Sequence, residues 1–359
     1  MKRISLTASV VWLLHVLFFL NATLEIFAFV VTKQNTRVEP VAGNFPNAGV
    51  TSVLVVKEDT VIAGTKNGKI LCSENPLNGS WTELQGYESK FPVYSMALDR
   101  DETLPKLFCG GGDRYISVWK QGTYEQRLGP HTGWVKHLQY DEANRLLYSI
   151  GCNCIETWGY NGPALTHLSK RSIENSPDMG ATLSSDLLCL SILDNGYLAA
   201  GGVDGRLHLW LPGYKVKDPV CSIRVHDGRV NALLFAPKAQ LLFSTGHDGC
   251  LHTIRPTSGM LILDTSLLIE GSPRLTAAGI ISDDNESVHL ALGSADGSIA
   301  FVHVEIRDNE RKLSHIGAVQ LSGSPMIHSL CILSMEGPER CLLVGHAAGL
   351  TQIYLPSVN

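Results

Sequence analysis

Short stretches of alternating apolar and polar residues recur along the chain, a period of two that is typical of half-buried β-strands. Clear examples are Ile116-Ser117-Val118-Trp119, Leu207-His208-Leu209-Trp210 and Ile299-Ala300-Phe301-Val302. A glycine-bearing turn precedes such stretches, which predicts that each is the returning strand of a hairpin. The pattern therefore predicts an all-β protein.

The turn occurs seven times, and its central Asn, Asp or Ala positions are 46, 40, 51, 44, 48 and 52 residues apart. These positions are Asn67, Asp113, Asn153, Asp204, Asp248, Asp296 and Ala348. Spacings of 40 to 50 residues are typical of the blades of a β-propeller. The repeats predict a single seven-bladed domain over residues 36–355.

A second pattern lies before each turn and reads apolar, any, small, apolar, any, apolar, as in Val230-Asn231-Ala232-Leu233-Leu234-Phe235. The other copies begin at Val50, Val93, Val135, Leu187, Leu275 and Ile327. The third position is small in six of the seven copies, and His137 is the exception. We interpret these segments as the innermost strands, with small residues that let the blades crowd around a central channel.

The fifth repeat contains His226, Ser244 and Asp248. Their spacing matches that of the His, Ser and Asp positions of a known repeat. The third repeat has His131, Ser149 and Trp158. On these residues the chain resembles the WD40 repeat family from about Thr36 to Leu355. It departs from the family in having no Trp-Asp dipeptide and in having Asn153 in place of Asp. The resemblance implies a seven-bladed WD40-like propeller in which His226, Ser244 and Asp248 form a structural hydrogen-bond network rather than a catalytic triad.

The way the ring closes is predicted from the end of the chain. Leu350 to Leu355 would be the third strand of the seventh blade, so the fourth must come from elsewhere. Thr36 to Ala42 has the right offset from Val50 to supply it. Pro40 is acceptable there because an outer strand is a sheet edge.

The first thirty-one residues differ from the rest. Lys2 and Arg3 precede an apolar run from Ile4 to Leu20, and a second run spans Ile26 to Val31. This pattern is typical of a signal peptide or membrane anchor. It predicts membrane attachment through residues 4–31 and a location in the membrane or secretory pathway. The alternative is a segment that packs on the propeller or follows a mistaken start site, which would leave the protein in the cytoplasm or nucleus.

Composition narrows the functional classes. Charged residues make up 18% and hydrophobic residues 44%, which predicts a packed core rather than disorder. A formal net charge of -5 disfavours nucleic acid as a partner. The nine cysteines include no C-x-x-C pair, and Cys152-Asn153-Cys154 is interpreted as a turn rather than a metal site. We expect no metal and no cofactor.

Sequence motifs of hydrolases, zinc proteases, phosphate-binding loops and dinucleotide-binding folds are absent. The leading interpretation is a non-catalytic scaffold that binds other proteins. A propeller hydrolase with a site at the channel mouth and a membrane-tethered adaptor of the secretory pathway remain as alternatives.

We place the contact surface at the residues that immediately precede the innermost strands, here called the top rim. Its members are Gly49, Pro92, Trp134, Asp186, Arg229, Arg274 and Met326. Tryptophan, methionine and arginine are enriched at protein interfaces, so Trp134, Asp186, Arg229, Arg274 and Met326 are the candidate interaction residues. The opposite face is formed by the loops between the first and second strands, has a formal charge of -8 and is interpreted as a solvated surface. Its thirteen acidic residues are Glu58, Asp59, Asp99, Asp101, Glu102, Asp141, Glu142, Asp194, Asp283, Asp284, Glu286, Glu336 and Glu339, and its five basic residues are Lys57, Arg100, Arg145, Lys238 and Arg340.

Overall fold

The structure is a computed structural model, and the residues it describes are 36–41, 49–57, 60–77, 80–100, 105–162, 164–173, 186–271, 274–307, 310–334 and 340–355. Within these ranges no helix has the length and hydropathy needed to cross a membrane. Residues 1–31 lie outside the described residues, so the predicted targeting segment is not tested.

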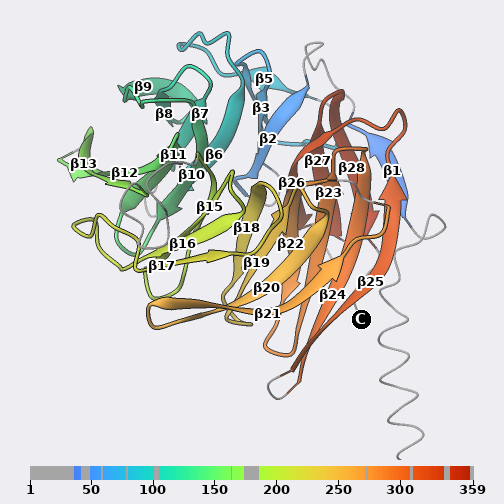
Figure 1. The fold of residues 1–359 in the computed structure, drawn as a ribbon. Coiled ribbons are helices and arrows are strands. Elements are labelled where there is room, and N and C mark those ends of the chain that lie inside the picture. The colour runs from blue at the N-terminus through green and yellow to red at the C-terminus, as the bar shows by residue number, and fades with distance from the viewer. Residues whose placement is uncertain are drawn as a thin grey trace, which may run out of the picture.

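All described regular structure is β-strand, arranged as seven antiparallel sheets of four strands each (Figure 1). Blades 1 to 3 contain β2(Val50–Val55), β3(Val61–Thr65), β4(Ile70–Ser73) and β5(Thr82–Glu83); β6(Val93–Asp99), β7(Lys106–Gly111), β8(Ile116–Lys120) and β9(Thr123–Leu128); and β10(Val135–Asp141), β11(Leu146–Gly151), β12(Cys154–Asn161) and β13(Ala164–Ser172). Blades 4 and 5 contain β14(Leu187–Ile192), β15(Leu198–Gly202), β16(Arg206–Trp210) and β17(Cys221–Arg224), then β18(Val230–Ala236), β19(Leu241–Gly246), β20(Cys250–Thr257) and β21(Met260–Leu268). Blades 6 and 7 contain β22(Leu275–Asp283), β23(Ser287–Ser294), β24(Ser298–Arg307) and β25(Glu310–Gln320), then β26(Ile327–Ser334), β27(Arg340–His346), β28(Gly349–Leu355) and β1(Arg37–Pro40).

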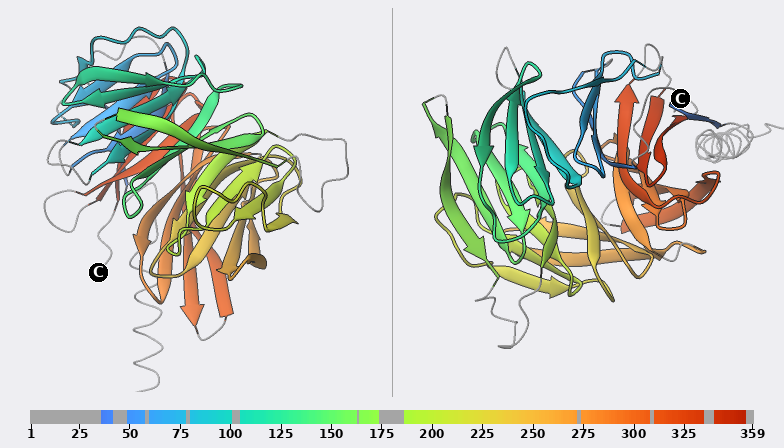
Figure 2. Two further views of the ribbon diagram at one scale, coloured as in Figure 1. Left: turned by 90° about the vertical axis from the view of Figure 1, so that its left-hand side faces the viewer. Right: turned by 90° about the horizontal axis from the view of Figure 1, so that it is seen from above.

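The blades form a closed ring. The innermost strand of each blade contacts the innermost strand of the next, and β26 of the last blade contacts β2 of the first. The blue first blade and red last blade accordingly lie side by side in Figure 2. The seven innermost strands begin at the seven residues predicted from the repeated pattern.

Ring closure follows the prediction. β1 is the outermost strand of blade 7 and pairs antiparallel with β28, with Arg37 opposite Tyr354 and Pro40 opposite Thr351. One residue further on, the backbone N–H of Val41 donates to the carbonyl of Leu350 at 3.0 Å. The edge of β28 is therefore paired rather than open to another chain.

Neighbouring blades approach closely where small residues face glycine. In five blades the small third position of the innermost strand is paired with a glycine of the second strand, as Ser52 is with Gly64. A methyl group added to these five glycines would lie 2.5–2.9 Å from the Val or Ile that begins the next blade. Blade 3 differs, because His137 is paired there with Ile150. The small residues thus have the crowding role that the sequence predicts, and blade 3 has bulkier side chains at this position.

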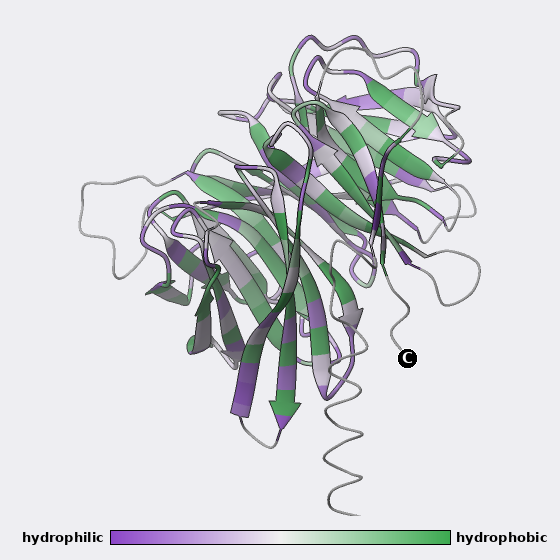
Figure 3. Ribbon diagram, turned by 90° about the vertical axis from the view of Figure 1, so that its right-hand side faces the viewer, coloured by the Kyte–Doolittle hydropathy of each residue, from purple (hydrophilic) through white to green (hydrophobic). Residues whose placement is uncertain are grey.

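Buried apolar residues fill each blade and the boundaries between blades, and Figure 3 shows polar and apolar residues alternating along the strands. Trp119, Trp158 and Trp210 are all at least 95% buried. The cysteines described as free are all half-buried or buried. Cys152 and Asn153 form the turn between β11 and β12, as predicted.

Candidate protein-interaction face

The fifth blade contains the network predicted from the WD40 resemblance. Nδ1 of His226 lies 2.9 Å from Oδ1 of Asp248, and Nε2 lies 3.0 Å from Oγ of Ser244. Asp248 also accepts the backbone N–H groups of Asp227 at 2.9 Å and Cys250 at 3.1 Å. Burial lowers the pKa of His226, and the hydrogen bond and the negative charge of Asp248 oppose this shift. The three side chains tie the turn, the second strand and the preceding loop of one blade together.

The third blade has a modified network. Nε2 of His131 lies 2.9 Å from Oγ of Ser149, and Nε1 of Trp158 donates to that same hydroxyl at 2.8 Å. Because Asn153 replaces the family's Asp, the nearest carboxylate oxygen to Nδ1 of His131 belongs to Glu156, at 3.5 Å. That distance is too long for a strong hydrogen bond.

One cluster in the described part of the chain has the residue types of a metal site. His226, Asp248 and His252 each have one candidate ligand atom, and these atoms lie within 4.8 Å of one another. Both ring nitrogens of His226 already take part in the hydrogen bonds described above, and Nδ1 of His252 lies 2.7 Å from Oγ of Ser266. These bonds account for His226 and Asp248, whereas Nε2 of His252 is buried without a hydrogen-bond partner among the described residues.

Six of the seven top-rim residues occupy backbone positions fixed by a hydrogen bond. Their carbonyls accept a bond of 2.8–3.0 Å from the turn between the second and third strands of their own blade, and Trp134 is the exception. The side chains of Asp186, Arg229 and Arg274 are exposed, and those of Trp134 and Met326 are 51% and 41% exposed. The exposed apolar side chain of Met326, on a hydrogen-bonded backbone, is suited to binding a partner with little loss of conformational entropy.

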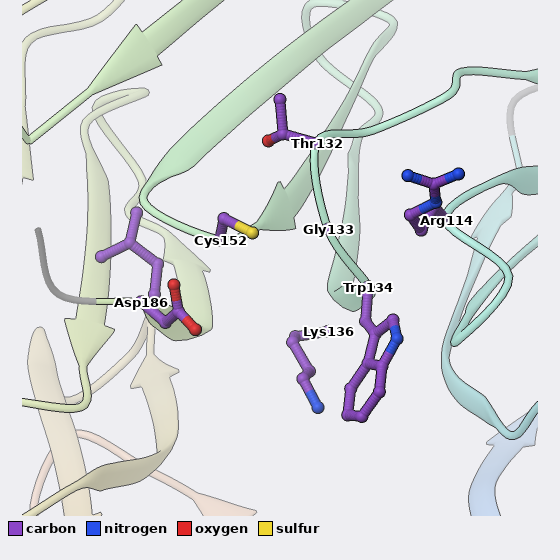
Figure 4. Close-up of a pocket in the computed structure, with 8 residues that line it drawn as sticks. Arg114, Thr132, Gly133, Trp134, Lys136, Cys152 and Asp186 are labelled. Atoms are coloured by element: carbon purple, nitrogen blue, oxygen red, sulfur yellow. The ribbon is translucent and has the colours of Figure 1, made fainter.

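A pocket of about 310 Å³ opens on the top face between blades 3 and 4 (Figure 4). It brings together two predicted rim residues, Trp134 and Asp186. Its other lining residues are Arg114, Thr132, Gly133, Lys136, Cys152 and Leu187. Arg229 is not among the lining residues, but its positive charge lowers the pKa of Lys136. Arg274 and Met326 lie on blades 6 and 7, outside the pocket.

One lining residue of the pocket, Lys136, lies against two aromatic rings. Nζ of Lys136 lies 4.1 Å from the ring centroid of Tyr94 and 4.5 Å from that of Trp134, within the range of cation–π attraction. The two rings are 5.9 Å apart. Burial lowers the pKa of Lys136, and the Asp186 carboxylate partly opposes this. Trp134 is therefore both an exposed rim residue and a support for a half-buried cation.

The sequence analysis missed Lys136, Tyr94 and Arg114. The sequence did offer one signal for Lys136, which is a charged residue at the second position of an innermost strand that is otherwise rich in apolar residues. The contact between Lys136 and Tyr94 joins two blades and is not encoded in either repeat alone.

The interpretation of the opposite face as a solvated surface is wrong for some of its acidic residues. Asp99 is fully buried and accepts a hydrogen bond from Oη of Tyr160, and Asp141 is 93% buried. Asp283 accepts the backbone N–H groups of Lys238 and Ala239 of the neighbouring blade at 2.9 and 3.1 Å. These carboxylates stabilise turns and blade contacts. Glu58, Asp59, Asp101, Glu102, Glu336 and Glu339 lie outside the described residues.

Two segments of the chain, residues 80–120 and 217–253, match the sequence model of the WD domain, G-beta repeat. Each runs from the outer strand of one blade to the third strand of the next, and the second contains His226, Ser244 and Asp248. No curated protein matches the chain. The crystal structure of the WD40 β-propeller domain of Doa1 is similar, with a TM-score of 0.68 and 14% identity over 89% of this chain and 96% of that chain.

The fold is a seven-bladed β-propeller of the WD40 kind. The resemblance to the WD40 repeat family is confirmed by the two matched repeats and the shared propeller fold. WD40 propellers generally serve as protein-interaction scaffolds without catalytic activity.

Proposed function

We propose that this protein is a non-catalytic scaffold that binds other proteins through its top rim. The observation that carries the proposal is the exposed indole of Trp134, fixed at the edge of a pocket that also contains Asp186 and Lys136. Tryptophan, tyrosine and arginine are enriched among the few residues that dominate binding energy at interfaces. Arg229, Arg274 and Met326 extend this surface around the rim.

We further propose that residues 36–355 form the scaffold domain and that residues 1–31 direct it to the membrane or secretory pathway. The support is the apolar sequence from Ile4 to Val31. The test is the location in cells of the full chain and of the protein beginning at Thr32. Loss of membrane or secretory location on removal of residues 1–31 is expected, and an unchanged location would contradict the targeting role.

The binding role is tested by the double variant Trp134→Ala with Arg229→Ala. We expect it to lose co-purifying proteins, since truncation of an interface anchor typically costs about 2 kcal/mol or more. The matched control is Glu142→Ala with Glu286→Ala, because both glutamates are exposed on the opposite face. Asp283 is unsuitable as a control because of its two backbone hydrogen bonds.

Melting curves of both double variants should match that of the native protein, so that loss of fold is not mistaken for loss of binding. Partner recovery that survives the rim changes but is lost in the opposite-face variant would reverse the choice of face.

A further inference from the structure

We propose that the pocket between blades 3 and 4 binds a carboxylate side chain from an acidic segment of a partner protein. This inference rests on the proposed scaffold function and names the chemistry that the top rim recognises. The charge of the pocket, the rigid placement of one cation and the construction of the blade boundary each support it.

The pocket has more positive than negative charge. Arg114 and Lys136 line it, and Asp186 is its single lining carboxylate. Within the described part of the chain, neither cation forms an ion pair of 4 Å or less. The neighbouring carboxylate of Asp113 accepts hydrogen bonds from Oη of Tyr87 and the backbone N–H of Tyr115, and it forms no ion pair with Arg114.

The side chain of Lys136 is preorganised by its contacts within the protein. The rings of Tyr94 and Trp134 hold its ammonium group at 4.1 and 4.5 Å from their centroids. A flexible lysine normally loses much rotamer freedom when it forms an ion pair, whereas a lysine already held between rings loses less. Its half-buried ammonium also has less water around it than a fully exposed one. A carboxylate that enters the pocket would therefore meet a cation already in place.

The walls favour a peptide over a free small anion. Trp134, which is 51% exposed, supplies apolar surface beside the charged groups, and the volume of about 310 Å³ exceeds the size of one carboxylate. A glutamate or aspartate with an apolar neighbour would satisfy both kinds of surface. Arg229 adds a third positive charge that acts on the same lysine.

The pocket opens above the boundary between blades 3 and 4, which is one of two boundaries that lack the pairing of a small residue with glycine. At this boundary His137 is paired with Ile150. At five other boundaries a small residue is paired with glycine, as Ser52 is with Gly64. Leu187, which begins blade 4, packs in one apolar cluster with Ile150 and lines the pocket. The bulkier residues that build this boundary thus also support the pocket wall.

The test uses pools of nine-residue peptides with random flanks and a fixed central residue, either Glu, Gln, Lys or phosphoserine. We expect the purified protein to retain the Glu pool at least fivefold better than the Gln or Lys pool. Lys136→Met should remove this preference, and Lys136→Arg should keep it. Asp186→Asn should strengthen retention of the Glu pool because it removes a repelling charge.

Lys238→Met, an exposed lysine of the opposite face, is the matched control and should leave the preference unchanged. If Lys136→Met does not fold, Arg114→Gln takes its place, since Arg114 is exposed in a turn. Equal retention of the Glu and Gln pools would overturn the carboxylate proposal, even if the protein retained the phosphoserine pool more strongly than either. Trp134-dependent binding without a Glu preference would overturn this inference alone, whereas partner capture that survives Trp134→Ala with Arg229→Ala overturns the scaffold surface itself.

Discussion

Nδ1 of His137 accepts a hydrogen bond from the backbone N–H of Leu190 at 2.8 Å, across the boundary between blades 3 and 4. Serine hydroxyls perform the same task at two other boundaries, where Ser95 binds the N–H of Leu138 at 3.0 Å and Ser329 that of Val53 at 3.1 Å. His137 is therefore larger than the residues at the equivalent positions of the other blades, but it accepts the same kind of hydrogen bond from the neighbouring blade as Ser95 and Ser329 do. Burial lowers its pKa to about 4, which leaves Nδ1 free to accept at neutral pH.

We predict that His137→Ala destabilises the protein by about 1–3 kcal/mol, since it removes the acceptor of a buried N–H group. His137→Asn, which keeps an acceptor oxygen, should cost less. Urea unfolding midpoints at pH 7.5 measure both changes. Equal stability of the alanine variant and the native protein would show that the bond contributes nothing.

Stability should fall as the pH decreases from about 6.5 to about 4. Burial lowers to about 4 the pKa values of five histidines, which are His131, His137, His208, His252 and His289. In this window the unfolded chain binds protons that the folded protein does not, so protonation favours unfolding. The contribution of these neutral histidines to the free energy of unfolding is fully present above about pH 6.5, the pKa of histidine in the unfolded chain. Below that pH, each histidine lowers the free energy of unfolding by on the order of 1 kcal/mol per pH unit.

The comparison of native protein with His137→Asn isolates one of these groups. The variant should lose less stability than the native protein between pH 7 and pH 5 in urea titrations. Parallel curves for the two proteins would contradict the titration of His137 in this range.

Asp248→Ala should destabilise blade 5 by about 1–3 kcal/mol because it leaves Nδ1 of His226 and two backbone N–H groups without their acceptor. The matched control is Asp227→Ala, whose side chain is 96% exposed in a surface ion pair with Arg224. That change should cost less than about 0.5 kcal/mol. Chemical unfolding distinguishes the two, and an unchanged midpoint for Asp248→Ala would contradict its structural role.

Removal of β1 should weaken the ring. The protein that begins at residue 32 keeps the pairing of Arg37–Pro40 with β28 and should melt as a cooperative unit. The protein that begins at residue 45 exposes the edge of β28, and we expect its melting temperature to fall by about 5 °C or more. Its light scattering should rise with concentration because an open edge can pair with another chain. Identical melting of the two proteins would contradict closure by β1.

Local sequence patterns were enough to predict the fold. Period-two alternation around Leu207–Trp210, the repeated turn at Gly246–Gly249 and the apolar-small pattern at Val230–Phe235 each report on contacts within one blade or with its neighbour. Since every blade repeats these contacts, seven weak copies predict the architecture together. The pairing of Thr36–Ala42 with the last strand was also predicted, from its offset from Val50. The partners of Asp248 were implied by the resemblance to the WD40 repeat family.

The sequence by itself determined the seven blades, the closing strand and the positions of the rim residues, because repeated short-range patterns specify them. The tertiary structure alone decided what the rim can bind. It brings Lys136 of one blade against Tyr94 of the previous blade, and places Asp186 of the next blade in the same pocket. It also buries Asp99 and Asp141, which the sequence analysis assigned to solvent. Such contacts depend on how adjacent blades pack, and residues more than forty positions apart in divergent repeats carry no local signal of that packing.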